Sequence, residues 1–134
     1  MMKITLLFVF IFAFGLLGVS ESVAADKKAK KAPAKKLRHI VCFKYQEGTA
    51  AAKIEEISRA FASLKGKIPG VIDFEMGENN SPEDHAKGFT HCYVVTFKDE
   101  AARDGYLPHP EHKHFVSILK PVIEDVFVID YWTR

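Results

Sequence analysis

Two segments that are apolar on both of their faces constrain this fold most. The segment 37–45, Leu-Arg-His-Ile-Val-Cys-Phe-Lys-Tyr, is rich in β-branched and aromatic residues, and so is the segment 89–97, which predicts a strand in each. In the first strand His39 and Phe43 share one face, while Cys42 lies on the other, because side chains alternate along a strand. A sheet built from such strands needs cover on both faces, or it exposes a large apolar patch.

The other segments predict helices and two further strands. Apolar residues spaced three and four apart predict an amphipathic helix that Thr49 caps and that stops around Gly66 and Pro69-Gly70. Its apolar stripe consists of Ile54, Ile57, Phe61, Leu64 and Ile68. Alternation predicts a strand over 71–77 that has one solvent-exposed face or lies at the edge of the sheet. The chain then predicts a short helix over 99–106, a helix from 110 to about 121, and a last strand over 126–132.

This order is β-α-β-β-α-β, with the second helix broken at Pro108. It predicts an α+β fold, a ferredoxin-like βαββαβ protomer with an antiparallel sheet and helices on one face. Because the helices cover only one face, we expect a homodimer in which a second copy covers the other.

Residues 1–36 are predicted to lie outside the folded domain of 37–134. Residues 1–25 place Lys3 before an apolar run and end in small residues, which is the order of a secretory signal peptide. An uncleaved anchor is the alternative, but the apolar run is shorter than the roughly 20 residues of a membrane span. Residues 26–36 hold six lysines with Ala and Pro, which is typical of a flexible linker. We therefore expect a secreted or periplasmic protein with no membrane span in its mature form.

Charge and missing motifs exclude several functions. The net charge is +2, and the lysines of the linker account for it, so the folded part carries no basic surface for nucleic acid. The sequence contains no Gly-rich phosphate loop, serine nucleophile elbow or CxxC pair. These absences argue against nucleotide chemistry and against hydrolysis or redox chemistry by those routes.

The segment 106–114, Tyr-Leu-Pro-His-Pro-Glu-His-Lys-His, holds the best candidates for chemistry. Pro110 suits the first position of a helix, which places His109 near the N-cap and His112 in the first turn. An imidazole and a phenol beside a pocket can move protons near neutral pH. Alternatively, these are surface residues around a helix start. A metal site at His109 and His112 is a third possibility, but the helical i, i+4 histidine pair is absent, so we expect no metal and no cofactor.

Two cysteines raise the question of a disulfide in an exported protein. Cys42 and Cys92 are predicted to lie on the same face of neighbouring strands, which we expect to be parallel. If His39 and His91 are level, the cysteines are offset by two residues, and their Cα atoms are then too far apart for a bridge. We therefore expect two buried thiols.

Several short motifs along the domain resemble those of a known family. They are Arg38-His39-Ile40-Val41, Gly88-Phe89-Thr90-His91, Val95-Thr96-Phe97, the segment Tyr106 to His112, and Asp130-Tyr131. Over 37 to about 132 the sequence resembles the stress-responsive dimeric α/β-barrel (Dabb) domains. The resemblance implies protomers whose sheets pair into a dimeric α/β barrel. One plant branch of that family is a polyketide cyclase that uses a histidine and a tyrosine.

The resemblance also implies roles for residues. His112 matches the base, Tyr106 its partner, and Asp130 the carboxylate that orients the histidine, which would raise the pKa of His112 unless burial outweighs it. The candidate ligand-binding residues are His39, His91, His109 and Phe61. We expect a protein that binds a small hydrophobic molecule, with cyclase-like or isomerase-like acid–base chemistry. The alternative is a non-catalytic stress-associated protein whose histidines are structural.

Overall fold

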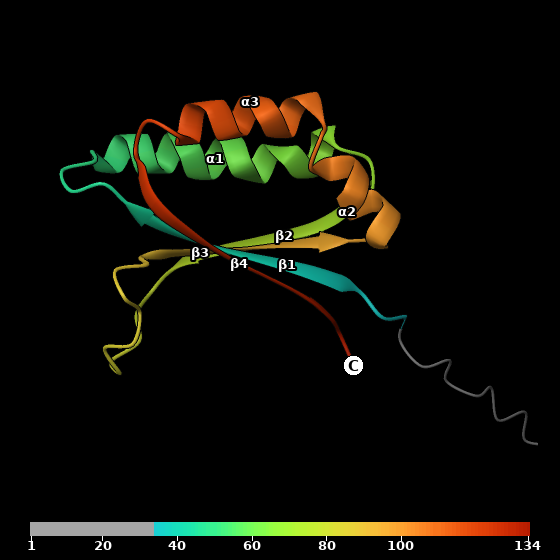
Figure 1. Ribbon diagram of the computed structural model, residues 1–134, viewed down its shortest axis with the longest axis horizontal. Helices are drawn as coiled ribbons and strands as arrows, with labels where there is room; N and C mark the ends of the chain where they lie inside the picture. Colours follow the sequence, from blue (N-terminus) through green and yellow to red (C-terminus); the bar gives the residue numbers. More distant parts are fainter. Residues whose placement is uncertain (1–33) are drawn as a thin grey trace, which may run out of the picture. The chain divides into compact units, whose positions relative to one another are not determined.

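A computed structural model describes residues 34–134, where strands and helices follow the predicted ferredoxin-like order (Figure 1). The elements are β1 (Leu37–Tyr45), α1 (Ala51–Lys67), β2 (Val71–Glu78), β3 (His91–Phe97), α2 (Glu100–Tyr106), α3 (Pro110–Leu119) and β4 (Ile123–Trp132). The signal peptide and residues 26–33 of the linker lie outside the described residues, so they stay predictions.

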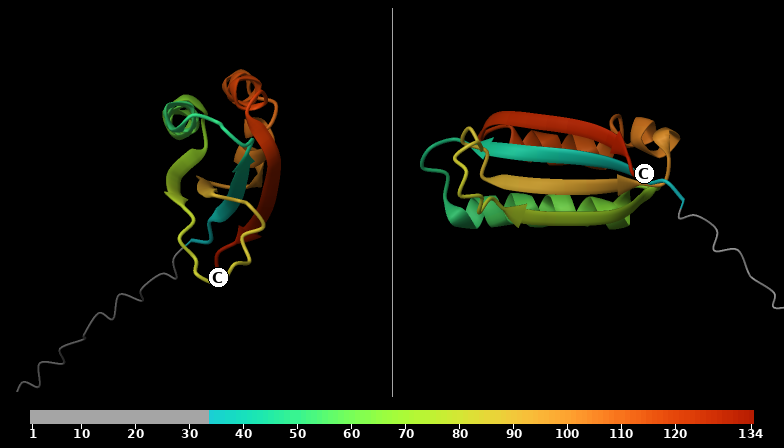
Figure 2. Two further views of the ribbon diagram at one scale, coloured as in Figure 1. Left: turned by 90° about the vertical axis from the view of Figure 1, so that its left-hand side faces the viewer. Right: turned by 90° about the horizontal axis from the view of Figure 1, so that it is seen from below.

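The four strands form one antiparallel sheet in the order β2-β3-β1-β4. The right-hand view of Figure 2 shows these strands side by side, and Figure 1 shows α1 and α3 on one face of the sheet. β2 is an edge strand, which is one of the two alternatives predicted for it, and β4 is the other edge. In this register His39 of β1 lies opposite Val95 of β3 and Asp130 of β4.

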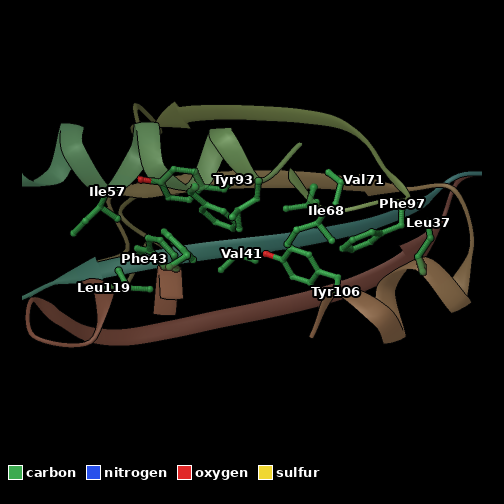
Figure 3. Packing of buried hydrophobic residues seen from close by; sticks show 14 residues of the cluster. Leu37, Val41, Phe43, Ile57, Ile68, Val71, Tyr93, Phe97, Tyr106 and Leu119 are labelled. Carbon is green, nitrogen blue, oxygen red and sulfur yellow. The ribbon is translucent and has the colours of Figure 1, made fainter. Parts of the chain in front are cut away.

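The core lies between the sheet and the helices α1 and α3 (Figure 3). Alternate residues of β1 are buried, as expected for a strand with one covered face. Their aromatic neighbours form a cluster in which the ring of Phe61 lies 4.4 Å from that of Phe115 and 5.0 Å from that of Tyr93. The hydroxyl of Tyr93 is hydrogen-bonded to Ser58 at 2.8 Å, so this buried polar group is paired.

The predicted N-cap of the first helix is wrong. The N-cap is Ala50, which has no side chain able to cap, while the hydroxyl of Thr49 donates to the carbonyl of Gln46 at 2.7 Å. Thr49 therefore closes the preceding turn rather than the helix. At the other end Gly70 has a φ of +86°, and a Cβ there would lie 2.4 Å from the Cβ of Ala102, so the turn into β2 requires glycine.

The strand bounds also differ from those predicted. β3 begins at His91 and not at 89, because the amide of Phe89 donates to Ala86 in a turn and Lys87 has a positive φ of 50°. β4 begins three residues earlier than predicted, at Ile123.

The predicted arrangement of the cysteines is wrong as well. β1 and β3 are antiparallel, not parallel, and Cys42 lies directly opposite Cys92. The offset of two residues followed from placing His39 and His91 level, whereas His91 lies opposite Phe43. Both thiols are free and half-buried.

The face of the sheet away from the helices carries an apolar surface, which we call the bare face. It consists of Ile40, Val94, Phe127, Ile129 and Tyr131. The three residues from β4 each expose close to half of their surface, 46%, 45% and 45% respectively. Exposed apolar surface of this kind marks an interaction site. Between residues 34 and 134, every helix is too short or too polar to cross a membrane.

Candidate functional site

A cavity of about 340 Å³ lies between β1, β4 and the helix α3. Its wall is mainly apolar and includes Val41, Phe43, Phe61, Phe115, Leu119 and Val128. The polar side chains in it are His39, Tyr106, His112 and Lys120. An apolar cavity with a few convergent polar groups is the usual form of a small-molecule site.

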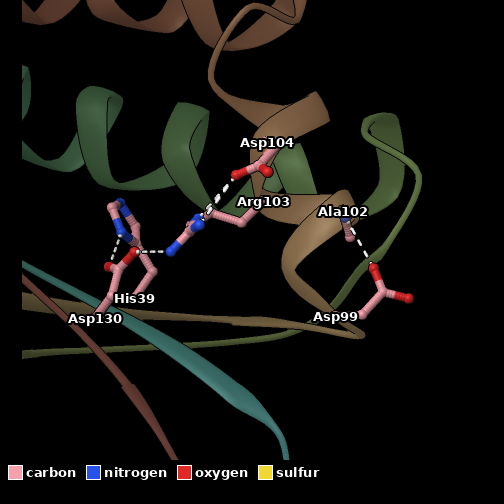
Figure 4. Close-up of polar contacts among 6 residues, drawn as sticks. All are labelled: His39, Asp99, Ala102, Arg103, Asp104 and Asp130. Atoms are coloured by element: carbon pink, nitrogen blue, oxygen red, sulfur yellow. Dashed lines mark hydrogen bonds and ion pairs between the residues drawn. The ribbon is translucent and has the colours of Figure 1, made fainter.

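The break between α2 and α3 brings Tyr106 and His112 together. Tyr106 is the last residue of α2, and Pro110 begins α3, so His112 falls in its first turn, as predicted. Asp99 starts α2 by accepting the amide of Ala102 at 2.9 Å (Figure 4). The rings of Tyr106 and His112 are 4.3 Å apart between centroids. Two short helices with defined starts therefore hold a phenol against an imidazole.

The hydrogen bond of His112 fixes which nitrogen can accept a proton. Its Nδ1 donates to the carbonyl of Leu107 at 3.1 Å, because a carbonyl can only accept. Nε2 of the neutral ring is then the free acceptor. Burial lowers the pKa of His112, an effect that the Leu107 carbonyl opposes and that the charge of His39 reinforces. His112 is therefore a neutral base at pH 7.

The hydroxyl of Tyr106 has no hydrogen-bond partner among the described residues, although the side chain is only 1% exposed. Burial raises the pKa of this phenol, so it stays protonated and can donate. A buried hydroxyl without a partner costs free energy. A bound molecule with an acceptor atom in the cavity would remove that cost.

Asp130 pairs with His39 and not with His112, so the predicted pairing is wrong (Figure 4). Nδ1 of His39 lies 2.6 Å from Oδ1 of Asp130, and Arg103 donates to Oδ2 of the same carboxylate at 3.1 Å. The register of β1 and β4 explains this, since His39 and Asp130 are direct partners. The carboxylate therefore orients the histidine on the sheet, while a backbone carbonyl orients the histidine on the helix.

Arg103 is the residue that the sequence analysis missed. It also bonds Asp104, at 3.0 Å, so it joins a chain from Asp104 through Asp130 to His39 (Figure 4). The signal was its position three residues before Tyr106, which places both on one side of a helix.

The other residues predicted to bind a ligand do not gather around Tyr106 and His112 as a group. His91 does not line the cavity with His39; its ring lies 5.2 Å from that of Tyr45 and it borders a different hollow. His109 is the N-cap of α3, where its Nδ1 accepts the amide of Glu111 at 3.2 Å. Phe61 lines the cavity but is 2% exposed and belongs to the core. Within residues 34–134 no three His, Cys, Asp or Glu side chains are grouped so that they could hold a metal ion.

Comparisons with known proteins agree with this fold. Residues 37–133 match the model of the stress responsive A/B barrel domain family. Olivetolic acid cyclase from Cannabis sativa is 26% identical over 98 residues, which cover 73% of this chain and 97% of the cyclase. Among solved structures, a hydroxynitrile lyase from Passiflora edulis is 28% identical with a TM-score of 0.70, and the match covers 76% of this chain and 96% of the lyase. A dimeric ferredoxin-like protein of unknown function from Jannaschia sp. CCS1 is 26% identical with a TM-score of 0.64, and the match covers 72% and 97% of the two chains. This chain therefore belongs to the stress-responsive A/B barrel domain family.

Proposed function

We propose that the cavity binds a small hydrophobic molecule that carries a polar group, and that the side chains of the cavity carry out acid–base chemistry on this group of the ligand. The observation that carries this proposal is the unpartnered hydroxyl of Tyr106 beside a neutral His112 in a mainly apolar cavity. An unpaired donor and a free basic nitrogen in such surroundings favour a ligand with a carbonyl or hydroxyl group.

In this proposal His112, Tyr106 and His39 have different roles. Nε2 of His112 accepts a proton from the substrate, since its Nδ1 is held by Leu107. Tyr106 donates a hydrogen bond to the oxygen on which negative charge develops. His39, oriented by Asp130, lines the same cavity and supplies a second imidazole. The names of two relatives suggest a ring closure and the cleavage of a hydroxynitrile. Both reactions, the first as the aldol closure that the family resemblance implies, begin with removal of a proton.

A panel of two substrate classes tests this proposal. In one assay the full chain is incubated with an aromatic hydroxynitrile, whose cleavage releases an aldehyde that absorbs in the ultraviolet. In the other it is incubated with a linear polyketone that can cyclise to an aromatic ring, and the cyclised product is detected by chromatography. Turnover above the buffer rate supports the proposal. If neither compound reacts and calorimetry detects no binding of an aromatic ligand, the protein is a non-catalytic member whose histidines are structural. The hydrogen bonds of His39 and His109 within the chain are the observations that favour this alternative.

Replacing Tyr106 by phenylalanine is expected to stabilise the ligand-free protein while weakening its function. The substitution removes a buried hydroxyl that has no partner, and such a group costs about 1–3 kcal/mol. The midpoint of thermal unfolding should therefore rise, while turnover or ligand affinity falls. The matched control is Tyr45→Phe, because the hydroxyl of Tyr45 is hydrogen-bonded to that of Tyr93 at 3.2 Å, and its loss should not stabilise. A lower unfolding midpoint for Tyr106→Phe would mean that the hydroxyl is satisfied in solution.

We also propose that the protein is a homodimer in which two bare faces cover each other. The support is the exposed apolar surface of β4 and the dimeric state of a related ferredoxin-like protein. Light scattering should give about twice the chain mass of 15.1 kDa. Phe127→Glu, which places a charge on the bare face, should shift the protein toward the monomer. Ala52→Glu on the exposed side of α1 is the control, and equal masses for both variants would contradict dimerisation through this face.

A further inference from the structure

The helix α3 gives the cavity of Tyr106 and His112 a long axis. Residues three and four apart share one side of a helix, and the residues of α3 and its C-cap that line the cavity have this spacing. They are His112, Phe115, Val116, Leu119 and Lys120. His112 and Lys120 are the two ends of this stripe. They are eight residues apart in sequence, which corresponds to about 12 Å along a helix.

Strand β1 gives a similar length for the cavity. His39 and Phe43 both line it, and a strand advances by about 13 Å between residues four apart in sequence. Figure 3 shows Tyr106 toward one end of β1 and Leu119 toward the other, with Val41 between them. All of these residues line the cavity. The cavity is therefore an elongated groove that follows α3 and β1.

The polar side chains of the groove lie at its opposite ends. The ring of Tyr106 lies 4.3 Å from that of His112 and 6.1 Å from that of His39, so these three share one end. Lys120 lies at the other end, where α3 finishes. The side chains that line the groove between the two ends are apolar. This arrangement fits an extended apolar molecule that carries one polar group near each of its ends.

The charge of Lys120 indicates which polar group belongs at its end. Lys120 is exposed, and within residues 34–134 no carboxylate pairs with its ammonium. Four other lysines do have such a partner, namely Lys44, Lys53, Lys65 and Lys67. A cation at the end of an apolar groove attracts an anionic group. A carboxylate fits better than a phosphate, because phosphate sites use helix N-termini and arginines, whereas Lys120 follows a helix C-terminus, whose dipole disfavours further negative charge.

The open side of the groove is lined by exposed apolar side chains. They are Leu107, Val116, Val126 and Val128. A bound apolar chain would remove part of this surface from water, which is favourable. The groove lies on the side of the sheet that carries α3 (Figure 1), so a second copy on the bare face leaves it open.

We propose that the ligand of this groove is an apolar chain with a carboxylate, which Lys120 binds while the opposite end of the chain reaches Tyr106 and His112. The ligand class is then an oxo or hydroxy carboxylic acid whose reacting carbon lies about 12 Å from the carboxylate. This inference rests on the proposed function for the cavity and for the reacting group, but the binding of the carboxylate requires no reaction.

Calorimetry with three unreactive molecules of one chain length tests this inference. Decanoate, decan-1-ol and decylamine are titrated separately into the full chain at about pH 8, where a carboxylic acid is ionised and an alkylamine is protonated. Decanoate should bind about two- to fivefold more tightly than decan-1-ol, the usual effect of one ion pair that is exposed to water, and decylamine should bind most weakly. Lys120→Met should abolish this preference. Lys120→Glu should reverse it, so that decylamine binds more tightly than decanoate.

Two further variants serve as controls. Lys113 is exposed on the same helix but does not line the cavity, so Lys113→Met removes the same charge and should keep the preference for decanoate. Val128 is an exposed part of the groove wall, so Val128→Phe should narrow the groove and weaken the binding of all three molecules.

Three results would overturn the inference. Equal binding of decanoate and decan-1-ol by the natural protein would remove the carboxylate subsite, while turnover in the substrate panel would still support the proposed chemistry. A preference that persists in Lys120→Met, or that is lost equally in Lys113→Met, would show that Lys120 does not bind the carboxylate. Binding of none of the three molecules would contradict both the subsite and an apolar ligand in this cavity.

Discussion

Replacing His112 by alanine is expected to slow the reaction in the cavity about 100- to 10,000-fold, the usual loss when a general base is removed. Nε2 of His112 is the free basic nitrogen beside the unpartnered hydroxyl of Tyr106, and alanine supplies no replacement. Alanine is a good helix former, so α3 should persist. The measurement is the rate with whichever compound of the substrate panel turns over, together with a circular dichroism spectrum that reports the fold.

His114→Ala is the matched control for this prediction. His114 lies in the same helix but is exposed and does not line the cavity, so its loss should leave the rate unchanged. An equal rate for the natural protein and His112→Ala would place the base elsewhere, and His39→Ala would then be the next variant to measure.

The pH dependence provides a check that needs no substrate. Burial lowers the pKa of His112, so the ring should titrate in an NMR experiment below the usual value of about 6.5. The neutral base is the active form, so the rate should be constant above this lowered pKa and fall as the pH drops through it. A pKa above the usual value would mean that a carboxylate lies close to His112 in solution.

The fold could be predicted from local patterns because each element carries a signal within its own segment. The apolar stripe through Ile57, Phe61 and Leu64 gives α1, and Pro110 fixes the start of α3. Strand ends were less certain, because they depend on turns such as the one that Phe89 closes with Ala86. The N-cap at Thr49 failed for the same reason, since its hydroxyl is used within the turn.

The site was only partly predictable because register is a property of the whole sheet. Tyr106 and His112 are neighbours in sequence, so their proximity followed from one helix break. Asp130 instead contacts a residue on the neighbouring strand, and a shift of one residue in the pairing of the two strands would turn its side chain to the opposite face. In the observed register the carboxylate of Asp130 pairs with His39. A similar error in the predicted register placed Cys42 two residues away from Cys92. Arg103 depends on the same long-range contact with Asp130.

Replacing Phe61 by alanine is expected to have the largest effect on stability. Its ring lies in a cluster with those of Phe115 at 4.4 Å, Tyr93 at 5.0 Å and Phe74 at 5.1 Å. Truncation of a buried Phe costs about 3–5 kcal/mol, whereas a domain is stable by only about 5–15 kcal/mol. Urea unfolding followed by circular dichroism should therefore show a much lower midpoint.

Leu107→Ala separates a core role of Phe61 from a role in ligand binding. Both residues line the cavity, but Leu107 is 50% exposed, so its truncation should change stability by only about 0.5 kcal/mol. If Phe61→Ala loses stability and Leu107→Ala does not, the aromatic cluster holds α1 on the sheet, and the ring of Phe61 is a core residue that also forms part of the cavity wall. If Phe61→Ala unfolds at the same urea concentration as Leu107→Ala but loses ligand affinity, the ring contacts the ligand, as predicted from the sequence, and the rest of the core is sufficient to hold the helix.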